Sequence, residues 1–137
     1  MKIFKKITQK LLYAIAVGIS IFLLFFVIGC TWIGYEAKIQ CQNAQREYGG
    51  DCTEALISLL KDESRGFRAR NDAIWALGQM GDSRALPVLE SYYTGNIPDR
   101  EPLNEMISQY ELKKAVNLTS DGANLAAWVW RWMFSSK

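Results

Sequence analysis

The side chains that could do chemistry in this sequence are few: three cysteines, scattered carboxylates and no histidine. Histidine is the side chain best suited to general acid–base catalysis near neutral pH. No serine lies in a G-x-S-x-G turn, and the spacing of Gly78-Gln79-Met80-Gly81 is typical of a helix end, not of a phosphate loop. The carboxylates Glu101, Glu105 and Glu111 are isolated acids of the kind found on solvated helix surfaces. The sequence therefore predicts a protein that is not an enzyme and that uses no cofactor or metal.

Two of the cysteines, Cys41 and Cys52, enclose a ten-residue segment that contains the flexible pair Gly49-Gly50. A metal site would lack ligands, because the chain has no histidine and no C-x-x-C motif. A redox-active pair is usually closer in sequence. A structural disulfide between the two cysteines would close a short loop and stabilise the fold by up to about 3 kcal/mol in the chain-entropy model. The bond requires an oxidising compartment, so this prediction depends on where the chain lies.

The N-terminal part of the chain indicates that location. Residues 1–10 contain four lysines and no acid, and residues 11–35 contain no charged residue at all. The uncharged run exceeds the roughly 20 residues that a helix needs to cross a bilayer. The preceding lysines favour a cytoplasmic N-terminus. We therefore expect a single-pass cell-membrane protein that contacts the lipid bilayer through residues 11–35, with its folded domain on the extracytoplasmic side.

The charge balance agrees with this division of the chain. The whole sequence has 16 basic and 14 acidic residues. Taking away the four leading lysines leaves 12 basic against 14 acidic residues, so the positive balance belongs to the N-terminal targeting region. Nucleic acid is not expected as a partner, because phosphate binding requires a concentrated basic surface.

The third cysteine, Cys30, leaves two kinds of anchor open. The sequence Val27-Ile28-Gly29-Cys30 resembles a bacterial lipobox, and lipidation would remove residues 1–29 and make Cys30 the mature N-terminus. However, the apolar run continues past Cys30, and Trp32 and Tyr35 are placed as the aromatic belt of an uncleaved span would be. The uncleaved anchor is the favoured interpretation and the lipoprotein the alternative. Both leave the domain tethered on the outer face.

An internal repeat organises the rest of the chain. A shift of 30 residues aligns residues 53–60 with residues 83–90, with Ala, Leu and Leu at equivalent positions. Asp82 stands at the N-cap of the second copy. A further shift of 39 places Asp121 under Asp82, with an insertion around residues 95–100. The spacing predicts about two and a half helix–turn–helix units.

Residues 69–89 have the sequence ARNDAIWALGQMGDSRALPVL. This stretch resembles HEAT-like repeats and is most similar to the short-period kind named after phycobilisome lyases. The resemblance extends well over residues 51–94 and loosely over 95–134, where helical spacing resumes from Pro102. It implies an α-solenoid fold and says almost nothing about function. It also implies that an acidic residue in the repeat turn meets a basic residue of the following helix, here Asp62 and Arg70.

The last helix has an unusual composition. A terminal repeat is expected to show a polar outer face, yet this helix is rich in tryptophan. Three interpretations stay open: the tryptophans close the core, they enter the outer membrane interface, or they dock another protein or copy. The residues that would form a membrane or partner face are Trp128, Trp130, Arg131, Trp132 and Phe134.

Together these patterns predict an all-α protein with three parts. Residues 1–35 form a basic N-region and a transmembrane or signal-anchor helix, residues 36–50 a stalk helix, and residues 51–137 a short HEAT-like α-solenoid. The expected function is that of a non-catalytic scaffold or adaptor that holds another protein at the extracytoplasmic face of a bacterial membrane. The alternative is an accessory structural subunit of a larger membrane complex, and a HEAT-type chromophore lyase is a more distant third.

Overall fold

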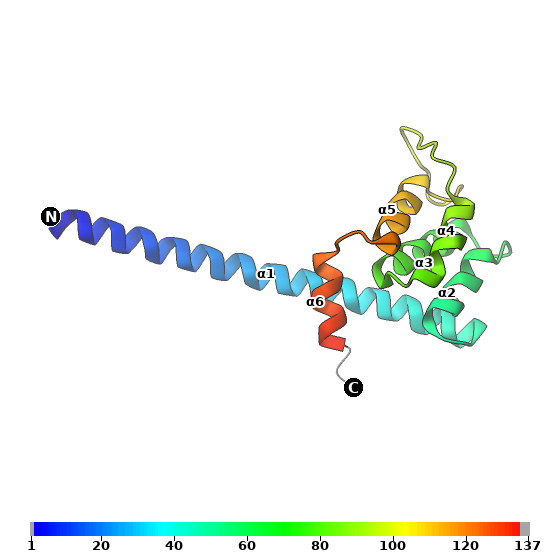
Figure 1. Ribbon diagram of the computed structural model, residues 1–137, viewed down its shortest axis with the longest axis horizontal. Coiled ribbons are helices and arrows are strands. Elements are labelled where there is room, and N and C mark those ends of the chain that lie inside the picture. Colours follow the sequence, from blue (N-terminus) through cyan, green and yellow to red (C-terminus); the bar gives the residue numbers. More distant parts are fainter. Residues whose placement is uncertain (1, 135–137) are drawn as a thin grey trace.

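The computed structural model describes residues 2–134, with side chains described for residues 8–131. Every regular element of the described chain is a helix and none is a strand, which confirms the predicted all-α class. Figure 1 shows one long helix, a group of packed helices around its C-terminal end and a last helix that crosses it. In order, the elements are α1 (Lys2–Tyr48), α2 (Cys52–Lys61), α3 (Phe67–Met80), the 3₁₀ turn η1 (Ser83–Ala85), α4 (Leu86–Tyr92), α5 (Gln109–Ser120) and α6 (Leu125–Phe134).

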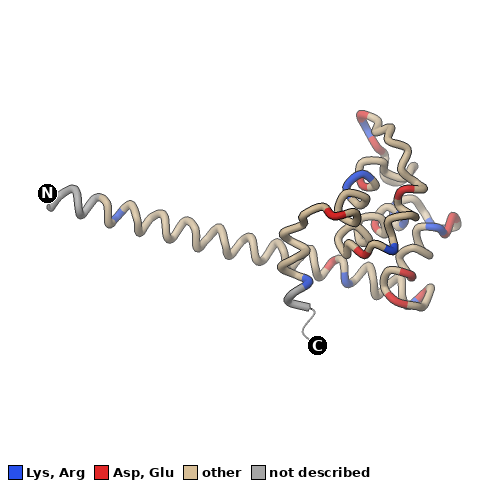
Figure 2. Tube along the Cα trace, in the orientation of Figure 1, with Lys and Arg blue, Asp and Glu red and all other residues tan. Residues whose placement is uncertain are grey.

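Helix α1 joins the expected anchor and stalk in one uninterrupted helix of 47 residues. Residues 8–29 are exposed on every side and project away from the other helices (Figure 1). Figure 2 shows that charged residues gather on the packed helices, and between Lys10 and Glu36 the sequence of α1 contains none. By length and composition α1 can cross a membrane.

From residue 30 onward, α1 has a buried stripe. Cys30, Ala37 and Ala44 are at most 3% exposed, and Tyr48 packs against the same core. The sequence analysis did not identify this stripe, because small residues give weak hydrophobic periodicity. The stalk is therefore not a free linker. It is a packed part of the helical domain.

Helices α2 and α3 form one hairpin, and η1, α4 and α5 form a second hairpin that packs beside it (Figure 1). Positions related by the 30-residue shift have equivalent places, since Ala55 and Ala85 are both fully buried and Leu59 and Leu89 are both in the core. The remaining core residues come mainly from these helices: Leu56, Leu60, Ala73, Ile74, Ala76, Leu77, Leu112 and Ala115.

The helix expected from Pro102 begins later, at Gln109. Its start is set by Ser108, whose hydroxyl accepts a hydrogen bond from the Glu111 backbone N–H at 3.0 Å, and by Glu101, whose carboxylate accepts from the Gln109 backbone N–H at 2.7 Å. A side-chain hydrogen bond supplied by a residue eight positions upstream of Gln109 is invisible to local helical spacing. The helical pattern after Pro102 therefore predicted the element correctly and its N-terminus wrongly.

Helix α6 does not continue the stack of hairpins. It crosses α1 instead (Figure 1). Asp121, which the 39-residue shift aligned with the N-cap Asp82, lies at the C-terminal end of α5 with a φ of 145°. Asn124 supplies the N-terminal hydrogen bond of α6, because its side-chain oxygen accepts from the Ala127 backbone N–H at 2.9 Å. The equivalence drawn between Asp82 and Asp121 is wrong, since α6 packs on a different neighbour.

Candidate functional site

The candidate site is the junction where α6 crosses α1, which we call the α1–α6 junction. Gly34 on α1 lets the two helices approach closely, because a Cβ built there would lie 2.7 Å from the Cβ of Trp130. Trp130 is only 9% exposed, and it packs in a small cluster with Ala37 and Ala127. Trp130 therefore holds α6 on α1 and is not available to a partner.

Arg131 connects α6 to the end of α3. Its guanidinium donates a hydrogen bond to the backbone carbonyl of Gln79, and it covers Gly81, which has a φ of +61° and no room for a side chain. Burial lowers the pKa of Arg131 from its usual value. A second bond joins the same elements, since the Asn124 amide donates to the Gln79 side-chain oxygen at 3.1 Å. The polar strip of α6 thus faces α3, and Arg131 acts in packing.

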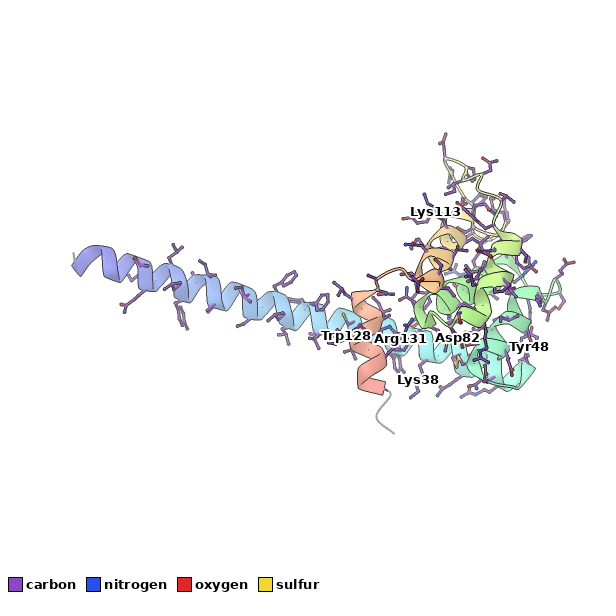
Figure 3. All side chains as sticks on the ribbon, in the orientation of Figure 1. Lys38, Tyr48, Asp82, Lys113, Trp128 and Arg131 are labelled. Carbon is purple, nitrogen blue, oxygen red and sulfur yellow. A yellow bond between two sulfur atoms is a disulfide. The ribbon has the colours of Figure 1, made fainter. Side chains whose placement is uncertain are left out.

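The side of α6 that faces away from α1 is open. Leu125 is 72% exposed and Trp128 is 73% exposed. Trp128 borders an open groove of about 560 Å³ between α6 and the end of α5, which is lined by Leu118, Gly122, Ala123, Asn124, Leu125, Trp128 and Arg131. Figure 3 marks Trp128 and Arg131 at the junction with α1. This groove is apolar apart from Arg131 and Asn124.

The five residues predicted to form one contact face therefore do not lie on one exposed surface. Trp128 is exposed, Trp130 is buried, and Arg131 is turned toward α3. The side chains of Trp132 and Phe134 lie outside the described residues. Leu125, which the sequence analysis did not include, is part of the exposed surface. Its exposure depends on which side of α6 meets α1, and helical spacing alone does not give that information.

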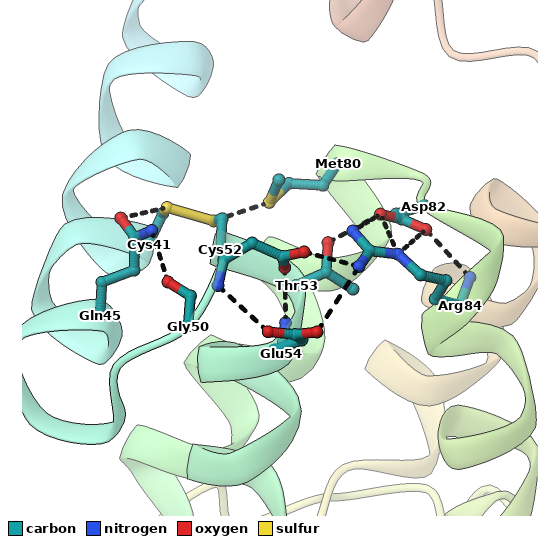
Figure 4. The surroundings of a disulfide bond; sticks show 10 residues. Cys41, Gln45, Gly50, Cys52, Thr53, Glu54, Met80, Asp82 and Arg84 are labelled. Atoms are coloured by element: carbon teal, nitrogen blue, oxygen red, sulfur yellow. Dashed lines mark hydrogen bonds and ion pairs between the residues drawn. A yellow bond between two sulfur atoms is a disulfide. The ribbon is translucent and has the colours of Figure 1, made fainter.

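The sulfur atoms of Cys41 and Cys52 are bonded in the structure, with their Cα atoms 5.2 Å apart (Figure 4). The bond joins α1 to the N-terminus of α2 across the turn at Gly49 and Gly50, whose φ values of +69° and +74° suit glycine. The Cys52 sulfur also lies 3.1 Å from the sulfur of Met80 at the end of α3. Three helices meet at this point.

Beside the disulfide, a charged cluster joins the N-termini of the two hairpins (Figure 4). Arg84 pairs with Asp82 and with Asp51, each at 2.6 Å, and Thr53 donates its hydroxyl to Asp82 at 2.9 Å. The Arg84 side chain lowers the pKa of Asp82 to about 2. Asp51 and Asp82 cap α2 and η1 respectively. The cluster therefore fixes the register of one hairpin against the other. Sequence reasoning found Asp82 and missed Arg84.

The expected pair between Asp62 and Arg70 is not a direct ion pair. Arg70 donates a hydrogen bond to the Leu60 backbone carbonyl at 2.8 Å and is buried. Asp62 accepts bonds from Ser64 and, at 2.6 Å, from the Tyr48 hydroxyl. The bond from Ser64, and then that from Tyr48, lower the pKa of Asp62, and the charge of Arg70 adds a smaller effect. Both residues stabilise the turn, but through different partners.

Cys30 is 3% exposed, at the start of the buried stripe of α1. A lipid on its sulfur would require this packing to open. Among residues 8–131, no group of three or more histidine, cysteine, aspartate and glutamate side chains is placed to hold a metal ion. The features of the site are apolar exposure, close helix packing and a groove, and these are the properties of a contact surface.

A family model described as HEAT repeats matches residues 33–101. The match begins inside α1, after Cys30, and ends in the segment before α5, so it includes the part of the buried stripe at Ala37 and Ala44, the first hairpin, η1 and α4. No curated protein and no solved structure matches this chain.

Proposed function

This chain belongs to the HEAT-repeat family, and on that basis we propose that it is a non-catalytic scaffold or adaptor tethered to a membrane. HEAT repeats generally mediate protein–protein interaction through the surface that their stacked helices present. The proposed partner is a protein held by the packed helices on the extracytoplasmic side.

The observation that carries this proposal is the division of α1 into two surfaces. Residues 8–29 are exposed and almost entirely apolar, and no other helix of the described chain packs against them. Residues 30–48, in contrast, have a stripe of side chains that is buried in the helical domain. A fully apolar helix surface is stable only where lipid or protein covers it. The lysines at the N-terminus support a cytoplasmic start, and the bond between Cys41 and Cys52 supports an oxidising compartment for the domain. A lipoprotein anchored at Cys30 remains the alternative form of the tether.

The experiment that tests this proposal replaces the exposed apolar residues 11–29 with a polyleucine span of the same length. The full chain is crosslinked in intact membranes and purified in mild detergent. A scaffold keeps its protein partner, because the partner binds the packed helices and the span is only an anchor. Loss of the partner would contradict the scaffold and support the accessory-subunit alternative, in which the anchor packs inside a larger complex.

A matched variant completes this test. Gly78→Leu leaves the anchor intact and disrupts the contact between α3 and α5, because a Cβ at Gly78 would lie 2.8 Å from the Cα of Ala115. The scaffold should lose its partner in this variant while the chain stays in the membrane fraction. Retention of the partner by Gly78→Leu would contradict binding through the helical domain.

A further inference from the structure

We propose that α6 is an interfacial helix, which lies in the headgroup region of the same bilayer that α1 spans, with Leu125 and Trp128 in contact with lipid. The inference rests on the proposed function, because it requires residues 11–35 to be in the membrane. It assigns a lipid contact to a surface that the HEAT-repeat family match does not reach, since that match ends at residue 101.

The position of α6 along α1 is the first step. Trp130 packs on Gly34, and Ala37 belongs to the same cluster. The uncharged run of α1 ends at Tyr35, followed by Glu36. The crossing therefore lies at the level where α1 leaves the apolar layer. Figure 1 shows α6 running across α1, so a span along the membrane normal places α6 along the membrane surface.

The surface chemistry of α6 is the second step. Residues 125–134 contain no acid and a single charged residue, Arg131, whose guanidinium is bonded to the Gln79 carbonyl of α3. Leu125 and Trp128 are exposed by 72% and 73%. Removing exposed apolar surface of this kind from water is favourable. The headgroup region is also where tryptophan is enriched in membrane proteins, because the ring is apolar and its N–H can bond to polar groups.

Continuity with α1 decides between lipid and a protein as the occupant of this surface. Trp32 and Tyr35, at the outer end of the uncharged run, are 71% and 59% exposed. Together with Val27, Ile28 and Thr31, they line an open, apolar surface hollow on α1. The exposed side chains of α6 and the exposed aromatic residues Trp32 and Tyr35 thus lie at the same level along α1, where α6 packs on Gly34. One lipid interface covers both surfaces, whereas a protein partner would have to bind at the membrane boundary as well.

The test uses spin labels on the full chain in phosphatidylcholine vesicles. Four single-label variants are made in a Cys30→Ala background with the bond between Cys41 and Cys52 intact: Trp32→Cys, Leu125→Cys, Trp128→Cys and Glu90→Cys. Trp32, Leu125, Trp128 and Glu90 are all exposed in the structure, so none of the four changes removes core packing. For each variant, we measure how often the spin label collides with molecular oxygen, which concentrates in lipid, and with a water-soluble nickel chelate.

We expect labels at 125 and 128 to lose collisions with the nickel chelate and to gain collisions with oxygen, as the label at 32 does. The label at 90, on α4, should collide freely with the nickel chelate. Labels at 125 and 128 that behave like the label at 90, or that meet neither reagent because a protein covers them, would overturn the inference while leaving the tether in place. A label at 32 that is accessible to the nickel chelate would overturn the tether itself, and the inference with it.

Discussion

The interface between α3 and α5 and the α1–α6 junction both depend on a glycine that lets two helices pack closely. They differ in how well the polar groups around that glycine are hydrogen-bonded. Each uses a glycine to bring two helices together: a Cβ at Gly78 would lie 2.8 Å from the Cα of Ala115, and a Cβ at Gly34 would lie 2.7 Å from the Cβ of Trp130. Close approach of this kind maximises dispersion contacts between the helices. The surroundings of the two glycines, however, are different.

Around Gly78, the polar groups near the core are satisfied. Asn71 on α3 is 4% exposed and makes three hydrogen bonds: its amide donates to the Leu103 and Met106 carbonyls, and its oxygen accepts from the Ser108 backbone N–H. Around Gly34, the Nε1 atom of Trp130 and the Nε atom of Arg131 are buried without a hydrogen-bond partner within residues 8–131. Buried polar atoms without partners destabilise an interface. We infer that the hairpins form one cooperative core and that α6 is a docked element that can open separately.

The largest expected effect comes from Gly78→Leu. The new side chain would overlap the backbone of α5, and the core offers no space, so the free energy of unfolding should fall by about 3 kcal/mol. Loss of helical signal during thermal denaturation in detergent measures the effect. Gly66→Leu is the control, because no atom lies within 4 Å of a Cβ at Gly66. A Gly78→Leu protein as stable as the control would show that the two hairpins are not one core.

Loss of the bond between Cys41 and Cys52 comes next, because it links α1 to the hairpins. The variant Cys41→Ser, Cys52→Ser should lower the free energy of unfolding by about 2–3 kcal/mol, as expected for a loop of this length. Denaturant unfolding under oxidising conditions measures it, with Cys30→Ala as the control for removal of a thiol. An unchanged denaturant midpoint would mean that helix packing alone holds α1 to the hairpins.

Gly34→Leu sharpens the comparison, because the same substitution is made at the other interface. We expect it to release α6 while the hairpins stay folded, at a cost limited to the docking free energy of about 1–2 kcal/mol. Tryptic cleavage after Arg131, which the bond to the Gln79 carbonyl protects, should become roughly 5- to 30-fold faster. Gly29→Leu, on the same helix with open space around it, should leave the cleavage rate unchanged. Global unfolding of Gly34→Leu would contradict the separate opening of α6.

Acidification gives the smallest effect and tests the charged cluster of the hairpins. Because Arg84 lowers the pKa of Asp82 from 3.8 to about 2 in the folded state, the stabilisation is complete above about pH 4 and is lost as the pH falls toward 2. Solvent screening of this partly exposed pair keeps the contribution small. Arg84→Met should therefore be less stable than wild type at pH 7, and the difference in denaturant midpoint should vanish near pH 2. Lys113→Met, which removes an exposed cation on α5, should not show this pH dependence.

Much of the first hairpin could be predicted from the sequence, because its information is local. The resemblance of residues 69–89 to HEAT-like repeats indicated the helix α3, and Asp82 marked the start of the next helical segment correctly. The start of α5 could not be predicted, because Glu101 caps it from a loop. Small residues on α1 concealed its buried stripe, because Ala37 contributes little hydrophobic periodicity.

The candidate site was predicted less well than the fold. The composition of the last helix indicated a contact surface, but its division into a buried Trp130 and an exposed Trp128 depends on the approach to Gly34. Gly34 lies almost 100 residues earlier in the chain and has no side chain with which to indicate a contact. Bonds between distant backbone and side-chain atoms, such as that from Arg131 to Gln79, likewise leave no periodic pattern.

Because α1 is one continuous helix, it resists twisting between the proposed span and the packed helices. Between residues 35 and 48 it contains neither glycine nor proline, so the sequence provides no flexible point between the proposed span and the packed helices. An α-helix turns by about 100° for each residue, and therefore one alanine inserted between residues 28 and 29 would rotate the domain by that angle relative to the lower part of the span. Under the proposed function, the direction in which the domain faces relative to the lower part of the span thus depends on the length of the apolar segment.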